Sequence, residues 1–172
     1  MALTPETGAG LSTANSYVTL AEFKAHHTAR GVASVTDGTY DDATMEAAVV
    51  QATDYIDKLY GIKFKGVRLQ SSQALAWPRV SAFDSSGYAL TGVPSALKKA
   101  THEYGLIVLG LDTKLAPNVE PEVLETKEVV GPIESHVKYD LGKSSSTKEY
   151  PEADLWLKEL VLSSADREVH RG

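Results

Sequence analysis

The feature that most constrains the fold is an apolar run that begins after Pro94. Apolar side chains recur in this run at helical spacing, at Leu97, Ala100, Tyr104, Ile107, Val108 and Leu111. A proline suits the first turn of a helix, where its missing backbone N–H removes no hydrogen bond. The broad apolar face therefore predicts a long helix that other elements of the chain must cover.

An aromatic loop precedes this helix. Trp77, Phe83 and Tyr88 stand among turn-forming residues, with Pro78 fixing one backbone dihedral and Gly87 permitting a tight turn. We expect the loop to fold back onto the helix as a cap. Burying one large ring there contributes about 2–3 kcal/mol, so Trp77 is predicted to be a folding residue.

Two further helices are expected before the loop. Thr19 and Glu22 have the spacing of a capping box, which predicts a helix from Thr19 that ends near Gly31. A second helix runs from a cap at Asp41 or Asp42 to about Tyr60. Its apolar residues are spaced four, three, four and three apart, at Met45, Val49, Ala52, Ile56 and Leu59. This spacing is typical of helices that pack on helices.

The C-terminal third changes character. Residues 126–140 are interpreted as two strands joined or bent at Gly131–Pro132, because side chains alternate from Ile133 to Asp140 with the period of a half-buried strand, and this predicts a β-hairpin. Pro151 opens a last helix, and a charged tail follows Leu162. That tail is expected either to lack structure alone or to continue the helix against a partner.

These patterns together predict one domain spanning 1–172 with a mainly α fold. We expect a four-helix bundle with a β-hairpin excursion between the third and fourth helices. Its parts are an extended N-terminal arm (1–18), a helical core (19–115), the hairpin (126–140) and a C-terminal helix and tail (150–172). An arm, a hairpin and a tail on one small core are typical of a subunit that buries such segments in an assembly.

Charge limits the classes of partner. Lys and Arg number 17 against 23 Asp and Glu, for a net charge of −6. That argues against a dedicated nucleic-acid binder, whose affinity rests largely on phosphate neutralisation. One local cluster of basic residues could be either a solvated turn or a binding patch. It consists of Lys58, Lys63, Lys65 and Arg68 around Tyr60 and Phe64. No apolar run approaches the roughly 20 residues of a membrane span, so no membrane partner is expected.

No catalytic motif is present. The chain lacks cysteine, a phosphate-binding loop and a nucleophile elbow, so we expect no enzyme, no cofactor and no metal site. A small hydrolase remains an alternative, using either the Asp54–Asp57 pair or His102 with Glu103. The adjacent His26 and His27 point about 100° apart on a helix, which suits a surface role better than a shared metal.

The sequence allows three roles for Arg79. Beside Trp77 it could pack internally, contact a neighbouring subunit, or help Trp77 to hold a nucleotide base. Internal packing is favoured, because the surrounding prolines and glycines indicate a folded loop.

Short motifs carry a family resemblance. They are W-P-R at 77–79, D-x-x-G-Y at 84–88, V-P-x-x-L-K-x-A-x-x-E at 93–103, an opening G-L-S-T-A-N-S-Y-V-T-L-A-E-F at 10–23, and G-P-I-E at 131–134. The chain resembles a family of tailed-phage virion proteins often labelled DnaT-like single-stranded-DNA-binding proteins. These are similar in layout to head–tail connector (adaptor) proteins.

The resemblance implies a structural role in the virion, at the head–tail interface, for a protein made in the host cytoplasm. The subunits would form a ring, commonly of about twelve copies. The ring would sit beneath the portal, extend the DNA channel during genome packaging and ejection, and join a tail-side stopper or tail-completion protein. DNA would pass through without specific binding. The alternative is the role in the label, a single-stranded-DNA-binding protein of phage replication.

The resemblance also suggests contact residues. The portal contact is expected at the C-terminal end, at Arg167, Val169, His170 and Arg171. Structural or subunit contacts are expected at Trp77, Arg79, Ile133, Val137 and Tyr139.

Overall fold

The computed structural model describes residues 2–110, 115, 123–129, 134–139 and 150–162. The chain divides into two compact units. The first, here called the core unit, comprises Met1–Asp112 and Tyr150–Gly172. The second, the hairpin unit, comprises Thr113–Glu149. Each is described by itself.

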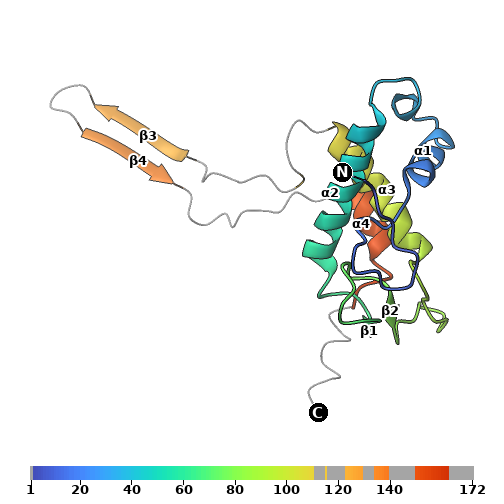
Figure 1. Cartoon of the computed structure of the whole chain (residues 1–172). Coiled ribbons are helices and arrows are strands. Elements are labelled where there is room, and N and C mark those ends of the chain that lie inside the picture. Colours follow the sequence, from blue (N-terminus) through green and yellow to red (C-terminus); the bar gives the residue numbers. More distant parts are fainter. Residues whose placement is uncertain (1, 111–114, 116–122, 130–133, 140–149, 163–172) are drawn as a thin grey trace, which may run out of the picture. The chain divides into compact units, whose positions relative to one another are not determined.

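The core unit holds four α-helices and a short 3-10 helix (Figure 1). These are α1 (Leu20–Thr28), η1 (Ala33–Val35), α2 (Asp42–Tyr60), α3 (Ser95–Gly110) and α4 (Pro151–Leu157). α3 packs against both α2 and α4, and α1 contacts α2 and α3. The mainly helical fold with four helices is confirmed. A four-helix bundle is not, because α1 has only nine residues and α4 only seven.

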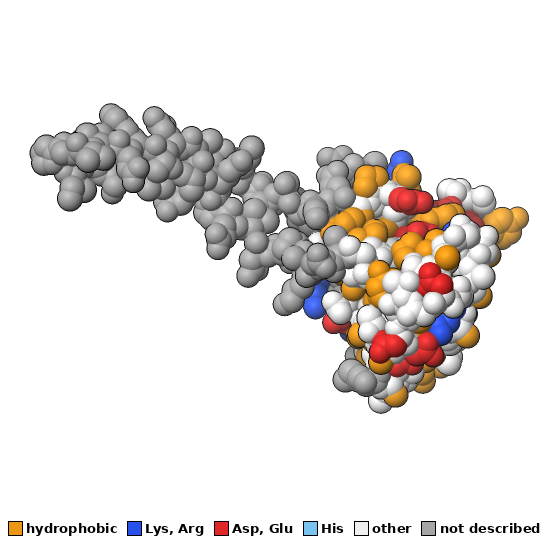
Figure 2. All heavy atoms as spheres, turned by 90° about the horizontal axis from the view of Figure 1, so that it is seen from above, with side chains coloured by type: hydrophobic (Ala, Val, Ile, Leu, Met, Phe, Trp, Pro, Cys, Tyr) orange, Lys and Arg blue, Asp and Glu red, His pale blue; other side chains and the backbone are white. Residues whose placement is uncertain are grey.

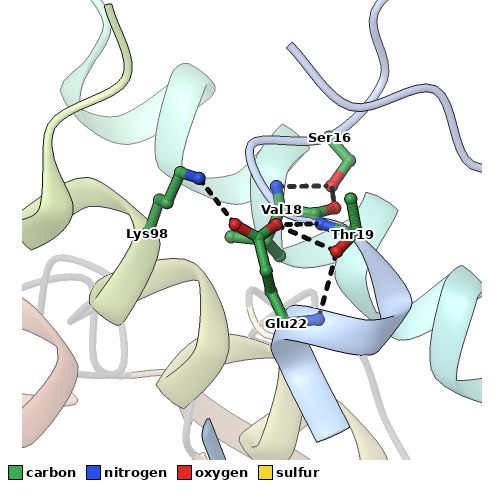
Figure 3. A network of polar contacts seen from close by, with 5 residues as sticks. All are labelled: Ser16, Val18, Thr19, Glu22 and Lys98. Carbon is green, nitrogen blue, oxygen red and sulfur yellow. Dashed lines mark hydrogen bonds and ion pairs between the residues drawn. The ribbon is translucent and has the colours of Figure 1, made fainter. Parts of the chain in front are cut away.

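The predicted helix starts are confirmed by their caps. The Thr19 side chain accepts a hydrogen bond from the Glu22 N–H at 3.1 Å, and the Glu22 carboxylate accepts one from the Thr19 N–H at 2.8 Å (Figure 3). Asp41 caps α2 by accepting from the Thr44 N–H at 2.7 Å. Pro151 occupies the first turn of α4. Each cap satisfies a backbone N–H that has no partner inside its own helix.

The core lies where α2, α3 and α4 meet the segment that joins α2 to α3. Its largest fully buried side chains include Tyr17, Phe23, Met45, Ile56, Phe64, Trp77, Leu97, Tyr104, Leu157 and Leu160. The predicted apolar face of α3 is buried at Leu97, Ala100 and Tyr104, and only half-buried at Ile107 and Val108. No described helix combines the length and the apolar character needed to cross a membrane.

The N-terminal segment differs from the extended arm expected for residues 1–18. Its described part, residues 2–18, closes on itself around Glu6, which is 4% exposed. The Glu6 carboxylate accepts hydrogen bonds from the N–H groups of Gly8, Gly10 and Leu11 at 2.8–2.9 Å. Tyr17 is fully buried. The buried Glu6 carboxylate thus accepts hydrogen bonds from three backbone N–H groups. The small, polar residues of this segment do not indicate that arrangement in the sequence.

The hairpin unit contains the predicted antiparallel pair, β3 (Val123–Val129) and β4 (Glu134–Tyr139). Val137 pairs with Thr126, and Tyr139 pairs with Val123 across a register shift between Val123 and Glu125. The pairing is confirmed, and β3 begins three residues before the predicted start at 126. Ile133 lies outside the described residues.

A second antiparallel pair lies in the core unit, formed by β1 (Val67–Arg68) and β2 (Arg79–Val80). The strand β2 was not predicted from the sequence. The pair lies at the lower end of the core unit in Figure 1, away from the N-terminal end of α2.

Candidate nucleic-acid interface

Residues 62–69 and 79–90 form the part of the core unit that we call the β1–β2 end. It is anchored by Trp77, whose side chain is 0% exposed. The Trp77 ring meets the buried Phe64 ring edge-on, with ring centroids 5.9 Å apart. The peptide bond between Trp77 and Pro78 is cis. Trp77 is therefore a core residue, and its ring is not available to stack on a base.

Arg79 joins the two strands of this end. Its guanidinium donates to the backbone carbonyl oxygens of Lys65 at 2.7 Å, Gly66 at 2.7 Å, Ala76 at 3.2 Å and Phe64 at 3.3 Å. A rigid fork of donors suits this many acceptors. Because the guanidinium is used within the chain, Arg79 takes the internal role among the three left open by the sequence.

Exposed apolar side chains surround this framework. Val67 and Val80 are paired across β1 and β2, so their side chains share one face of the ribbon. Phe83 is 51% and Tyr88 74% exposed. Both flank a turn in which Asp84 accepts hydrogen bonds from two backbone N–H groups, including that of Tyr88 at 2.8 Å. The expected burial of the loop aromatics is thus wrong for Phe83 and Tyr88, whereas Trp77 is buried, against Phe64.

This end is rich in basic residues. Residues 61–90 contain Lys63, Lys65, Arg68 and Arg79 but only one acidic residue, Asp84, for a net charge of +3. The rest of the chain therefore carries −9, since the total is −6. One carboxylate from α4's C-terminal side also reaches this end, because Glu159 accepts a hydrogen bond from the Ser85 hydroxyl at 2.8 Å. The Lys65 Nζ lies 3.4 Å from the backbone carbonyl oxygen of Phe83.

The predicted basic cluster is only partly retained. Lys58 pairs with Asp54 at 3.6 Å along α2. Tyr60 donates its hydroxyl proton to Asp154 at 2.6 Å, and Phe64 is 1% exposed. The aromatic partners named from the sequence are therefore not stacking surfaces. The exposed rings are Phe83 and Tyr88, and their positions on both sides of an Asp-x-x-Gly turn were the signal that could have identified them.

Asp54 and Asp57, considered above as a catalytic pair, make structural contacts. Asp57 accepts hydrogen bonds from the Tyr17 hydroxyl and from the Ala76 N–H, while Asp54 is exposed beside Lys58. The two carboxylates therefore do not face one reaction centre. In the described residues, no group of three or more His, Asp or Glu side chains is arranged to hold a metal.

The predicted portal contacts, Arg167, Val169, His170 and Arg171, lie outside the described residues. The face of the core unit seen from above in Figure 2, opposite the β1–β2 end, shows acidic and basic side chains interspersed. No continuous basic patch is visible on that face among the described residues.

Comparison with known proteins gives one match. No curated protein and no solved structure matches the chain. A family model matches residues 1–172, the whole of the sequence. The chain therefore belongs to the family described as "Putative DnaT-like ssDNA binding protein".

Proposed function

We propose that this protein binds single-stranded DNA through its β1–β2 end. The observation that carries the proposal is the position of two exposed aromatic rings, Phe83 and Tyr88, in a segment, residues 61–90, that has a net charge of +3. The family description supports it. Proteins that bind single strands combine a positive surface for phosphates with aromatic rings on which bases stack.

The charges set the expected strength. Arg79 is engaged by backbone carbonyls, and Arg68 donates one hydrogen bond to the Gln73 carbonyl oxygen. Lys63, Lys65 and the remaining donors of Arg68 are therefore the cationic groups proposed to contact phosphates. Three phosphate contacts on a single strand give a slope of about −2 in a plot of log K against log salt. Base stacking on a ring adds about 1–3 kcal/mol per base. Binding should therefore depend on both charge and stacking.

The net charge of −6 argues against this function for the chain as a whole, but it does not describe the charge at one end. At physiological salt, exposed charges are screened over about 8 Å. A strand at the β1–β2 end would therefore respond mainly to the charges next to it, which include the carboxylates of Asp84 and Glu159 as well as the cations, and only weakly to acidic groups at the opposite end of the core unit.

The test is binding of a labelled oligothymidylate at physiological salt. The double variant Lys63→Gln/Lys65→Gln should weaken binding about tenfold, because it removes two of the three cations. The control is Lys24→Gln/Arg30→Gln, which changes the net charge equally but alters α1, and it should leave binding nearly unchanged. Phe83→Ala should weaken binding by at least about fivefold. No binding by the wild type, or equal losses in both double variants, would refute the proposal.

A second function is favoured by the hairpin unit. In the described residues, β3 and β4 pair only with each other, and a two-stranded hairpin alone is marginally stable in water. We propose that it gains stability by packing against another subunit. This supports the alternative role of a head–tail connector, a ring in the virion that contacts the portal and a tail-side stopper protein.

Mass measurement of the assembled protein tests this second function. The full chain should form a ring, and a variant with residues 113–149 replaced by a Gly/Ser linker should remain folded but monomeric. Truncation after Leu162 should give a folded subunit that no longer co-purifies with the portal. A full chain that stays monomeric in the presence of portal would reject the connector role. A truncated chain that still attaches would place the portal contact elsewhere.

A further inference from the structure

Three histidine rings meet where α1 packs on α3. His26 and His27 come from α1, and His102 comes from α3. The His26 and His102 rings stack, with centroids 4.3 Å apart. The His27 ring lies 5.0 Å from the His26 ring and 6.2 Å from the His102 ring, and contacts Phe23 on its other side. His27 and His102 are nearly fully buried, at 1% and 5% exposure.

The hydrogen bonds of these rings favour neutral imidazoles. The His27 Nε2 lies 3.0 Å from the backbone carbonyl oxygen of His102, which can only accept, so Nε2 carries the proton. The Nδ1 atoms of His27 and His102 are buried and have no hydrogen-bond partner among the described residues. A neutral ring tolerates this better than a charged one, because a protonated ring would bury an unpaired charge.

The carboxylates beside the rings are already paired. Glu103 on α3 lies 3.0 Å from the His26 Nε2. Glu22 on α1 is 2.7 Å from the Lys98 Nζ on α3 and also closes the cap of α1 (Figure 3). Of the charged groups that act on His27, Glu103 raises its pKa, whereas His26 and Arg30 lower it. Protonation of His27 or His102 would therefore place a new positive charge near cations, with no unpaired carboxylate to offset it.

We propose that the α1–α3 contact is an acid-sensitive latch, closed while His27 and His102 are neutral and opened by their protonation. Opening would displace α1 and the segment before it. Tyr17, three residues before α1, donates to Asp57, which also accepts from the Ala76 N–H. Loss of α1 would therefore also loosen the loop that contains Trp77. The proposal does not depend on which ligand the protein binds.

The direction of the pH effect follows from the histidine pKa values. Burial, with the neighbouring histidines, lowers the pKa of His102 to about 3, and burial lowers the pKa of His27. The ordinary pKa of histidine is about 6.5. The unfolded chain therefore takes up these protons first as the pH falls. The stability given by the neutral rings is complete above about pH 6.5 and declines towards the folded-state values.

The first experiment follows the histidine rings of the wild type by NMR from pH 8 to pH 4. The His102 ring should stay neutral in the folded protein at pH 5, at which a free imidazole is almost wholly protonated. A His102 ring that is charged in the folded protein at pH 5 would overturn the proposal. This measurement needs no variant, so it decides the question even if substitutions impair folding.

The second experiment measures urea unfolding at pH 7.5 and pH 5.0. Each of the two groups can raise the unfolding constant up to about 30-fold over this interval. His102→Gln should remove one such factor from the pH dependence, and His136→Gln, on β4 of the hairpin unit, should remove none. Amide exchange should show α1 losing protection at pH 5.0 before α2. Equal pH dependence in wild type and His102→Gln would also overturn the proposal.

Discussion

At the scale of single residues, the β1–β2 end depends on a buried ring and a glycine. Trp77 fills the core beneath the loop, and Arg79 then finds four carbonyl oxygens within reach. Gly66 allows the two strands to approach, because a Cβ there would lie 2.3 Å from the Val80 carbonyl oxygen. These contacts keep Phe83 and Tyr88 at the surface, so local substitutions should separate stability from binding.

Trp77→Ala should lower the free energy of unfolding by about 3–5 kcal/mol, because it leaves a large cavity in the core. Urea denaturation measures this change. The control is Trp156→Ala, since Trp156 is 36% exposed and the Lys99 Nζ lies over its ring, 4.3 Å from the ring centroid. That variant should cost at most about 1 kcal/mol. Similar losses in both variants would contradict the anchoring role of Trp77.

Gly66→Ala should destabilise the protein by more than Gly87→Ala. Both glycines have positive φ, +71° and +85°, so both variants include the backbone strain of about 1 kcal/mol. Only Gly66 has neighbours within 4 Å, at Val80 and Ala82, so its variant adds an overlap worth about 1–3 kcal/mol. Thermal or urea unfolding of the two variants measures the difference between their unfolding free energies, and this difference gives the cost of the steric overlap at Gly66. Equal losses of stability in the two variants would mean that β1 and β2 can move apart at Gly66 without a cost in free energy.

At the scale of elements, α4 is short and depends on one carboxylate. Asp154 accepts the hydroxyl protons of Tyr60 from α2 and Tyr104 from α3. Burial and the Asp154 carboxylate raise the pKa of Tyr60 and Tyr104, so both hydroxyls donate at neutral pH. One residue of a seven-residue helix thus joins three helices.

Asp154→Ala should cost about 2–3 kcal/mol, because the half-buried Tyr60 and the buried Tyr104 lose a charged acceptor for their hydroxyl groups. The matched control is Glu152→Ala, an exposed acidic residue on the same helix that should change stability by less than about 0.5 kcal/mol. Denaturant unfolding followed by circular dichroism compares the two. An Asp154→Ala variant as stable as the control would show that apolar burial alone docks α4.

At the scale of the whole molecule, the division into two units suggests that one chain serves two purposes. The core unit carries the β1–β2 end, and the hairpin unit carries a two-stranded sheet. A two-stranded hairpin alone is marginally stable in water, so we propose that this one gains stability at another surface.

Amide exchange of β3 and β4 tests this division. In the free subunit these amides should exchange at least about tenfold faster than those of α2 and α3, and they should become protected on assembly. The helices serve as the internal control in the same sample. Equal, strong protection of β3 and β4 in the free subunit would show that the hairpin needs no other subunit, and would weaken the connector role.

The sequence by itself determined the local elements. The Thr19–Glu22 capping box, the Asp41 cap, Pro151 and the alternation in β4 each specify an element through residues a few positions apart. The buried spacing along α2 and α3 was also readable, because helical periodicity shows which side chains share a face.

Only the tertiary structure decided how distant residues meet. The carbonyl partners of Arg79 and the cluster of His26, His27 and His102 depend on residues that are far apart in the chain. The candidate interface depends on the same kind of contact, because burial of Trp77 leaves Phe83 and Tyr88 exposed. Local sequence patterns identify the residues that could bind a ligand. Burial and long-range hydrogen bonds decide which of these residues remain available for binding.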